Sequence, residues 1–326
     1  MKILLLKAGA LGDILMTTPV IRQLREHFPS AQIDYMVGNG CQTVLNDNPH
    51  LNSVITFDSN IFFKHKLIDM LKLAKNIRAK QYDIVFLFDK HWIFSLTSFL
   101  AGIKKRIGFA RDFPSRIFLT EYVNYKLPRH EIHYYLDLVD KIAKANHNDT
   151  KMDLSINKTS KEKVQTFIRK NNLHNFLVFI NSGGENSVET GGTRKLPNTF
   201  FKKTLKKLSK NNQILLIGGK TDKDYYDKFI LNKNITNIAG QFTIAESTEL
   251  MRFAKRVYTT DCGPMHMAAT VNNNITAYFG PTNPKRKAPL VKHIETVWND
   301  EDIYEETYEL YGKIPKKTKT FFRKLK

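Results

Sequence analysis

Short apolar runs alternate along the whole chain with longer stretches of helical period. Runs of Ile, Val, Leu and Phe predict buried strands, because the strands of a parallel sheet are covered on both faces. Their alternation with amphipathic helices is typical of a parallel sheet flanked by helices. In the first half, strands are predicted over residues 2–7, 32–37, 53–57, 83–88 and 106–109, and helices over residues 14–27, 67–79 and 131–145.

The same alternation starts again after a polar stretch at residues 146–160, which predicts a linker between two α/β domains. We place the boundary after residue 150. Strands are then predicted over residues 177–181, 213–218, 235–238, 256–260 and 274–279, and helices over residues 161–171, 198–209, 222–231, 245–254 and 264–270. A chain of 326 residues is long enough for two such domains.

The cysteine spacing and the lengths of the apolar segments indicate in which compartment the protein works and whether it spans a membrane. The two cysteines, Cys41 and Cys262, have neither a metal-ligand nor a redox spacing. This favours a reducing compartment, and we expect a cytoplasmic protein. The apolar start of the chain is interrupted by Gly9, Gly12 and Asp13, so it predicts a first strand and no signal peptide. No window is long and uncharged enough to predict a membrane span.

Basic residues outnumber acidic ones by 51 to 31, which gives a net charge of +20. This charge predicts attraction to polyanions or to an anionic membrane surface, without choosing between them. The segment 312–326 carries seven Lys or Arg and no acid, together with Phe321 and Phe322. It could lie on an anionic membrane, or it could be an ordinary solvated terminus.

The first candidate motif is KAGALGDILMTTP, in which a glycine-bearing turn joins a strand to a helix. In open α/β sheets, ligands bind beyond the carboxyl ends of the strands, where this turn lies. Asp13 could serve there as a general base, or it could simply cap the helix. The turn lacks the glycine spacing of a dinucleotide-binding fingerprint, which argues against a nicotinamide-dependent enzyme.

The second motif, TTDCGPMHMAAT, places Asp261, Gly263, Pro264 and His266 where a strand gives way to a helix. Amides at a helix start bind phosphate oxygens, glycine lets a ligand approach, and proline suits the first helical turn. The motif therefore predicts a cradle for a diphosphate, although a lone histidine is more often structural.

Two further loops follow strands of the second half. The loop NSGGENSVETGGTRKLP contains Thr190 and Lys195, which could hold phosphate, although glycine-rich loops can also be merely mobile. Its spacing does not fit a Walker-type nucleotide loop. In LLIGGKTD, Asp222 stands where a carboxylate could bind a ribose hydroxyl.

These four motifs, in this order, resemble the ADP-heptose:lipopolysaccharide heptosyltransferase family over most of the chain. The most specific parts are Gly12-Asp13 with Thr18-Pro19 downstream, and Asp261 through His266. The resemblance implies a GT-B fold, in which two Rossmann-like parallel-sheet domains face each other across a cleft. It assigns acceptor binding to residues 1–150 and nucleotide-sugar binding to residues 151–311, with 312–326 as a basic tail. The sequence departs from the family at Lys7, Asp222, Cys262 and Leu196.

By the same resemblance, Asp13 matches the catalytic base. We expect an inverting transfer that uses no metal ion or other cofactor. The donor-binding residues would be Thr190, Lys195, Asp222, Asp261, Gly263, Pro264 and His266. The partners would be ADP-heptose or a related nucleotide sugar, an anionic glycolipid, and the inner leaflet of the cytoplasmic membrane as a peripheral site. Basic residues that could hold the acceptor are Lys64, Lys66, Arg111 and Arg116.

Other functions fit the sequence less well. A transferase of the same fold could use another nucleotide sugar or glycolipid acceptor. A nicotinamide-dependent oxidoreductase shares the alternating pattern but needs the fingerprint that the first turn lacks. A nucleic-acid-binding protein could use the net charge, but the sequence contains no nucleic-acid-binding motif, and we expect no nucleic-acid partner.

Overall fold

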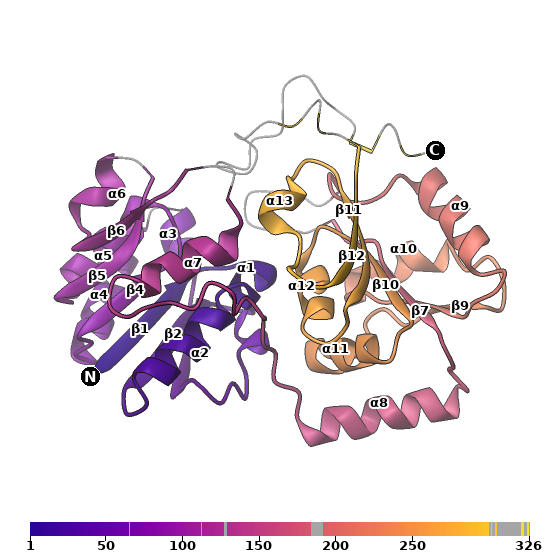
Figure 1. Ribbon diagram of the computed structural model, residues 1–326, viewed down its shortest axis with the longest axis horizontal. Helices are drawn as coiled ribbons and strands as arrows, with labels where there is room; N and C mark the ends of the chain where they lie inside the picture. Colours follow the sequence, from indigo (N-terminus) through magenta and orange to yellow (C-terminus); the bar gives the residue numbers. More distant parts are fainter. Residues whose placement is uncertain are drawn as a thin grey trace. The chain divides into compact units, whose positions relative to one another are not determined.

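The computed structural model describes residues 1–64, 66–111, 113–126, 129–183 and 192–299, together with 301, 304, 321, 322 and 325. The chain divides into two compact units, Met1–Ser155 and Ile156–Lys326, and each contains one six-stranded parallel sheet with helices on its faces (Figure 1). None of the helices in the described ranges is long and apolar enough to cross a membrane.

The sheet of the first unit has the strand order β3-β2-β1-β4-β5-β6. Its strands are β1 (Lys2–Lys7), β2 (Gln32–Gly38), β3 (Ser53–Phe57), β4 (Ile84–Leu87), β5 (Lys105–Ala110) and β6 (Glu121–Asn124). Its helices are α1 (Leu11–Leu15), α2 (Thr18–His27), α3 (Asn60–Phe63), α4 (Leu67–Ala79), α5 (Trp92–Leu100), α6 (Phe113–Ile117) and α7 (Glu131–Val139).

Alternation along the central strand β1 sends side chains to both faces of this sheet. Leu4 and Leu6 pack into a buried cluster with residues of α4 and α5, while the neighbouring Ile3 and Leu5 point to the other face. Helices α2 and α7 contact each other, as do α4 with α5 and α5 with α6 (Figure 1). Burial on both faces explains why the strand is a continuous apolar run.

The second unit repeats this arrangement, with the strand order β12-β11-β10-β7-β8-β9. Its strands are β7 (Leu177–Ile180), β8 (Ile214–Leu216), β9 (Ile235–Asn237), β10 (Arg256–Thr260), β11 (Asn274–Phe279) and β12 (His293–Trp298). Its helices are α8 (Lys158–Lys170), α9 (Asn198–Leu208), α10 (Lys223–Asp227), α11 (Ile244–Arg252), α12 (Gly263–Ala269) and α13 (Pro284–Lys287).

Both sheets have the strand order 3-2-1-4-5-6 of a doubly wound α/β fold, so the predicted Rossmann-like architecture is confirmed. The order reverses between β1 and β4 in the first unit, and between β7 and β10 in the second. Ligands of such sheets bind at these reversal points, beyond the carboxyl ends of the strands. Loops that follow these four strands are therefore the places to look for a site.

Several predicted elements differ from the observed ones. The helix predicted over 14–27 is two helices, because Pro19 lacks the N–H that would continue the ladder. The hydroxyls of Thr17 and Thr18 donate to the carbonyls of Ile14 and Leu15, both at 2.7 Å, where α1 ends. The helix predicted over 131–145 ends at Val139, and that over 222–231 is reduced to α10 after a short 3-10 turn.

The unit boundary lies after Ser155, within the predicted linker. The start of that polar stretch belongs to the first unit because its acids bind α2. Arg22 donates to Asp149 at 2.8 Å and also pairs with Asp153. The amide of Asp153 donates to the hydroxyl of Thr18 at 2.8 Å.

The last described residues pack into the second unit. Phe321 and Phe322 are buried in the apolar cluster that also contains residues of β7, β8, α9 and α10. The hypothesis that these two phenylalanines lie on a membrane is therefore wrong, because their rings are covered by the protein. The lysines and arginines of the 312–326 tail lie outside the described residues.

Candidate functional site

Asp13 lies beyond the carboxyl end of β1, beside the reversal point of the first sheet. It sits in the first turn of α1, and the N-cap of this helix is Ala10, so Asp13 is not the capping residue. Its side chain is partly exposed, and so it is accessible to a ligand. This placement agrees with the ligand edge that the sequence predicted for it.

A partly buried ion pair lies next to Asp13. The ammonium of Lys7, at the end of β1, is 3.3 Å from Oδ1 of Asp89, which follows β4. The other carboxylate oxygen of Asp89 accepts a hydrogen bond of 2.6 Å from the amide of Ala8. Asp89 thus binds both the side chain and the backbone at the start of the turn that carries Asp13.

The charge of Lys7 is set by its surroundings. Burial lowers the pKa of Lys7, but the carboxylates of Asp89, Asp13 and Glu131 outweigh this effect and raise the pKa above its ordinary value. Lys7 therefore remains protonated at neutral pH. A fixed positive charge stands near the Asp13 carboxylate.

A second ion pair lies at the same reversal point. The ammonium of Lys90 is 2.6 Å from the buried carboxylate of Glu131, at the start of α7. It also lies 4.4 Å from the centre of the Tyr125 ring, whose hydroxyl donates to Glu131 at 2.5 Å. Both carboxylate oxygens of Glu131 accept hydrogen bonds, and these interactions offset the cost of burying its charge.

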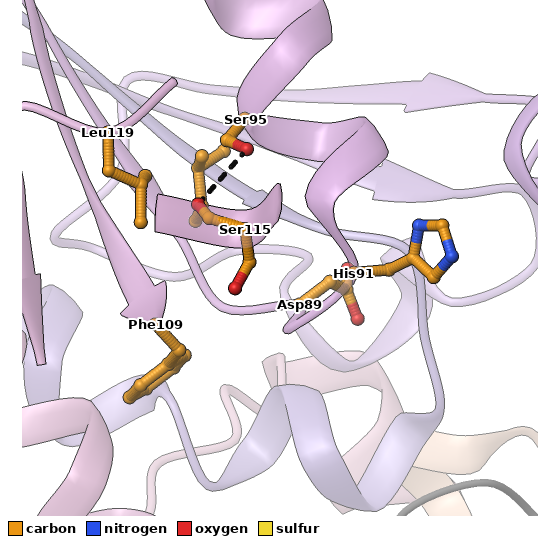
Figure 2. A pocket seen from close by; sticks show the side chains of 7 residues that line it. Asp89, His91, Ser95, Phe109, Ser115 and Leu119 are labelled. Atoms are coloured by element: carbon orange, nitrogen blue, oxygen red, sulfur yellow. Dashed lines mark hydrogen bonds between the residues drawn. The ribbon is translucent and has the colours of Figure 1, made fainter. Parts of the chain in front are cut away.

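A small pocket opens beside Asp89, between the ends of β4 and β5 (Figure 2). Polar groups of Asp89, His91, Ser95 and Ser115 line it together with apolar side chains. The hydroxyl of Ser95 donates to the carbonyl of Ser115 at 3.5 Å, and Nδ1 of His91 accepts from the amide of Ile93 at the start of α5. The remaining lining residues are Leu87, Phe109 and Leu119.

In the second unit, Asp261 follows β10 at the reversal point of the sheet. Its buried carboxylate accepts from Arg194 at 3.0 Å and from the hydroxyl of Thr282 at 2.5 Å. These partners come from the loops that follow β7 and β11. Thr260 also donates to the carbonyl of Ser182 at 2.7 Å. Asp261 thus ties three loops together at the ligand edge of this sheet.

Helix α12 begins directly after Asp261-Cys262. Gly263 and Pro264 occupy its first turn, and the side chain of Cys262 at the N-cap makes no capping hydrogen bond to this turn. His266 is buried on the same helix. Asp261, Gly263, Pro264 and His266 thus lie between the end of β10 and the first residues of α12.

Lys195 and Asp222 form another ion pair at this edge, with 3.4 Å between the ammonium and Oδ1. The ammonium also lies 4.7 Å from the centre of the Tyr225 ring. The second oxygen of Asp222 accepts from the amide of Gly219 at 3.0 Å. A Cβ on Gly218 would lie 2.7 Å from that oxygen, so glycine is required for this close approach. Lys195 and Asp222 are adjacent, although the sequence separates them by 27 residues.

The four basic residues predicted for the acceptor lie at the carboxyl edge of the first sheet, in two separate places. Lys64 and Lys66 are exposed after α3, which follows β3, and Lys66 is 3.9 Å from Asp58. Arg111 follows β5, and the guanidinium of Arg116 lies 4.7 Å from the centre of the Tyr122 ring. Since β2, β1 and β4 separate β3 from β5, the two pairs do not form one cluster.

Some residues of these sites were not singled out from the sequence. Asp89 and Lys90 directly follow a predicted strand, and that position could have identified them. Glu131 and Thr282 carry no local signal, since their partners are distant in the chain. Arg194 is adjacent to Lys195, but its pairing with Asp261 was not predictable. Thr190, a predicted donor residue, lies outside the described residues.

Comparisons with known proteins agree with this architecture. The chain is similar to lipopolysaccharide heptosyltransferase 2 of Escherichia coli K12, with 25% identity over 305 residues that cover 89% of this chain and 86% of that protein. It is similar to lipooligosaccharide heptosyltransferase 2 of Haemophilus ducreyi, with 26% identity and coverage of 90% and 87%.

Solved structures share the fold. The crystal structure of a family 9 glycosyl transferase from Veillonella parvula superposes with a TM-score of 0.79 at 21% identity, covering 95% of this chain and 90% of that one. The E. coli ADP-heptose lps heptosyltransferase II gives a TM-score of 0.73 at 22% identity, with coverage of 91% and 90%.

The model of the family described as glycosyltransferase family 9 (heptosyltransferase) matches residues 70–310, which is well over half of the chain. Together with the two doubly wound sheets, this match shows that the chain is a glycosyltransferase and belongs to glycosyltransferase family 9, the heptosyltransferases.

Proposed function

We propose that this glycosyltransferase transfers a heptose from ADP-heptose to a lipopolysaccharide core acceptor, with inversion at the anomeric carbon and without a metal ion. The relatives named above are lipopolysaccharide and lipooligosaccharide heptosyltransferases, and one solved neighbour is an E. coli heptosyltransferase with ADP, with a TM-score of 0.69 at 17% identity. These names support both the donor and the acceptor.

The observation that carries the proposal is the position of Asp13 at the β1/β4 reversal point, beside the protonated Lys7. The carboxylate of Asp13 accepts the proton of the acceptor hydroxyl as that oxygen bonds to the anomeric carbon. The bond from the anomeric carbon to the β-phosphate oxygen breaks on the opposite face, and ADP leaves with the electron pair. A positioned base contributes about 10²- to 10⁴-fold in rate.

In this proposal, the second unit binds the donor. Lys195 is available as a counter-charge for the diphosphate, where it would exchange part of its contact with Asp222 for phosphate oxygens. Asp261 orients Arg194 and the loops around it, and Gly263, Pro264 and His266 stand at the same edge. Positive side chains would thus take the place of a metal ion as the leaving group gains charge.

Replacement of the base tests the proposal. Asp13→Asn keeps the size of the side chain but cannot accept the proton, so kcat should fall by about 10²-fold or more. ADP affinity, measured by calorimetry, should change little. Glu162→Gln, on the exposed face of α8, removes the same charge far from the site in the sequence and should retain activity.

The assay is mass spectrometry of reactions that contain ADP-heptose and purified core acceptors. Lys195→Ala and Asp261→Ala should instead weaken ADP binding, because their proposed roles concern the donor. If Asp13→Asn transfers heptose at nearly the parental rate, another group deprotonates the acceptor. If the parent protein transfers no heptose but accepts another nucleotide sugar, the proposed donor is wrong while the assignment of the base remains testable.

A further inference from the structure

Asp89 extends the contact between β1 and β4 beyond the last paired residues of the two strands. The register pairs Leu6 with Leu87, and the amide of Phe88 still donates to the carbonyl of Leu6 at 3.0 Å. One residue further along the chain, a side chain takes the place of the backbone, because Oδ2 of Asp89 accepts the amide of Ala8 at 2.6 Å. This carboxylate thus holds the first residue after β1, at the start of the turn that leads to α1.

The Ala8 residue is held from its other side as well. Its carbonyl accepts a hydrogen bond of 3.2 Å from the amide of Gly38, at the end of β2. Ala8 is therefore attached to the residues that follow β4 and to the end of β2, the two neighbours of β1 in the sheet. Since Asp13 follows only a few residues later, in the first turn of α1, these two hydrogen bonds constrain where its carboxylate lies.

The same Asp89 side chain binds the cation next to Asp13. Oδ1 of Asp89 lies 3.3 Å from the ammonium of the buried Lys7. The carboxylates of Asp89 and Asp13 both help to raise the pKa of Lys7, so one cation is shared between two acids. A nearby cation favours the ionised form of a carboxyl group, and a nearby anion disfavours it. Asp89 therefore offsets the effect of Lys7 on Asp13.

The other titratable side chains around Asp13 come from several elements. Three of them stay neutral at neutral pH, because burial raises the pKa of each. These are Tyr35 on β2, Cys41 in the loop after β2, and Tyr135 on α7. Glu131 on α7 is paired with Lys90, and His91 lines the adjacent pocket (Figure 2). The charge balance at Asp13 thus depends on the ion pair at the end of β1.

We propose that Asp89 is a positioning residue of the transferase, which fixes the turn before Asp13 and offsets the charge of Lys7, so that Asp13 remains an effective base. This inference rests on the proposed role of Asp13 and deepens it. Asp89 acts in this way without touching the donor or the acceptor. A merely structural role for Asp89 would instead predict a loss of stability with an unchanged pH profile.

The pH profile of kcat/KM tests the proposal, because its acidic limb reports the titration of the base in the free enzyme. Asp89→Asn keeps an oxygen that can accept the amide of Ala8, but it removes the negative charge and leaves Lys7 to stabilise the ionised form of Asp13. The acidic limb should therefore move to lower pH by about one unit. On the plateau, kcat should fall by about threefold or more, because the base becomes weaker.

Lys7→Met provides an independent test, because it removes the cation and should move the acidic limb to higher pH. In Lys7→Met/Asp89→Asn the two shifts should largely cancel. Asp83→Asn is the matched control: Asp83 precedes β4, at the opposite edge of the sheet, and its Oδ2 accepts the amide of Lys2 at 2.8 Å. This control removes the same charge and the same kind of hydrogen bond, and its acidic limb should stay in place. Thermal unfolding verifies that the variants are folded.

A second measurement follows the same titration without turnover. In ¹³C NMR of labelled aspartate carboxylates, Asp13→Asn identifies the Asp13 resonance, which should titrate at lower pH in Asp89→Asn than in the parent. A parental acidic limb and a parental Asp13 titration in folded Asp89→Asn would overturn the inference, and so would equal shifts in Asp89→Asn and Asp83→Asn. If Asp13→Asn transfers heptose at the parental rate, the proposed base is wrong, whereas a shifted Asp13 resonance in Asp89→Asn would still support the coupling between the two acids.

Discussion

Replacing Phe322 by alanine should destabilise the second unit, although only four residues follow it in the sequence. Its side chain is 4% exposed and packs in the cluster of β7, β8, α9 and α10. A Cβ on Gly280 would lie 2.9 Å from the tip of the Phe322 ring, so the ring fills its space closely. Removing a buried phenylalanine side chain costs about 3–5 kcal/mol of unfolding free energy.

The backbone conformation of Phe322 does not affect this comparison. Phe322 has φ of 65°, a conformation that is unfavourable for phenylalanine and alanine alike, so the difference reports the side chain. For a unit of this size, each kcal/mol lowers Tm by about 2–4 °C, and the expected decrease is about 6–20 °C. The assay is differential scanning calorimetry of the full chain.

Phe253→Ala is the matched control, because that side chain is 42% exposed and its loss should cost far less. Truncation after Gly312 should destabilise the second unit at least as much as Phe322→Ala, since it removes both rings. If Phe322→Ala unfolds within about 1 °C of the parent, the packing argument is wrong and the tail contributes nothing to this core.

Two further predictions concern the candidate sites. ADP should bind in excess EDTA with the same affinity as in its absence, because Lys195 is proposed as the counter-charge of the diphosphate, and calorimetry would reveal any dependence on a metal ion. Gly38→Ala should cost about 1–3 kcal/mol and lower transferase activity, because a Cβ there would lie 2.1 Å from the carbonyl oxygen of Ala8, in the turn that leads to Asp13. Urea unfolding and turnover measure the two effects, and parental values for both would refute the proposed crowding.

The sequence predicted the buried strands well. The strands over 2–7, 53–57, 256–260 and 274–279 agree with β1, β3, β10 and β11 to the residue. Of these, β1, β10 and β11 are central strands covered on both faces, so their apolar runs are continuous and end where the loops begin, whereas β3 is an edge strand that was found from its β-branched run SVITF. The edge strands β6 and β12 were missed because EYVN and HIETVW contain no more than two consecutive apolar residues.

Local motifs also located most of the candidate site. Asp13, Asp222 and Asp261 each follow a strand, and the carboxyl ends of parallel strands meet at one edge of the sheet. Chain order alone therefore predicted which loops would lie at a ligand edge. It did not predict the partner of each acid, because an ion pair depends on which strands become neighbours.

Only the tertiary structure decided those pairings. Lys7 and Asp89 are 82 residues apart, and they meet because β1 and β4 are adjacent at the point where the strand order reverses. Arg194 reaches Asp261 across 67 residues for the same reason at β7 and β10. The sequence determined the strands, the loops and the acids within them. The folded sheets determined which charged side chains pair. They also determined that the two phenylalanines of the basic tail lie in a core, because the burial of a side chain depends on neighbours that are distant in the chain.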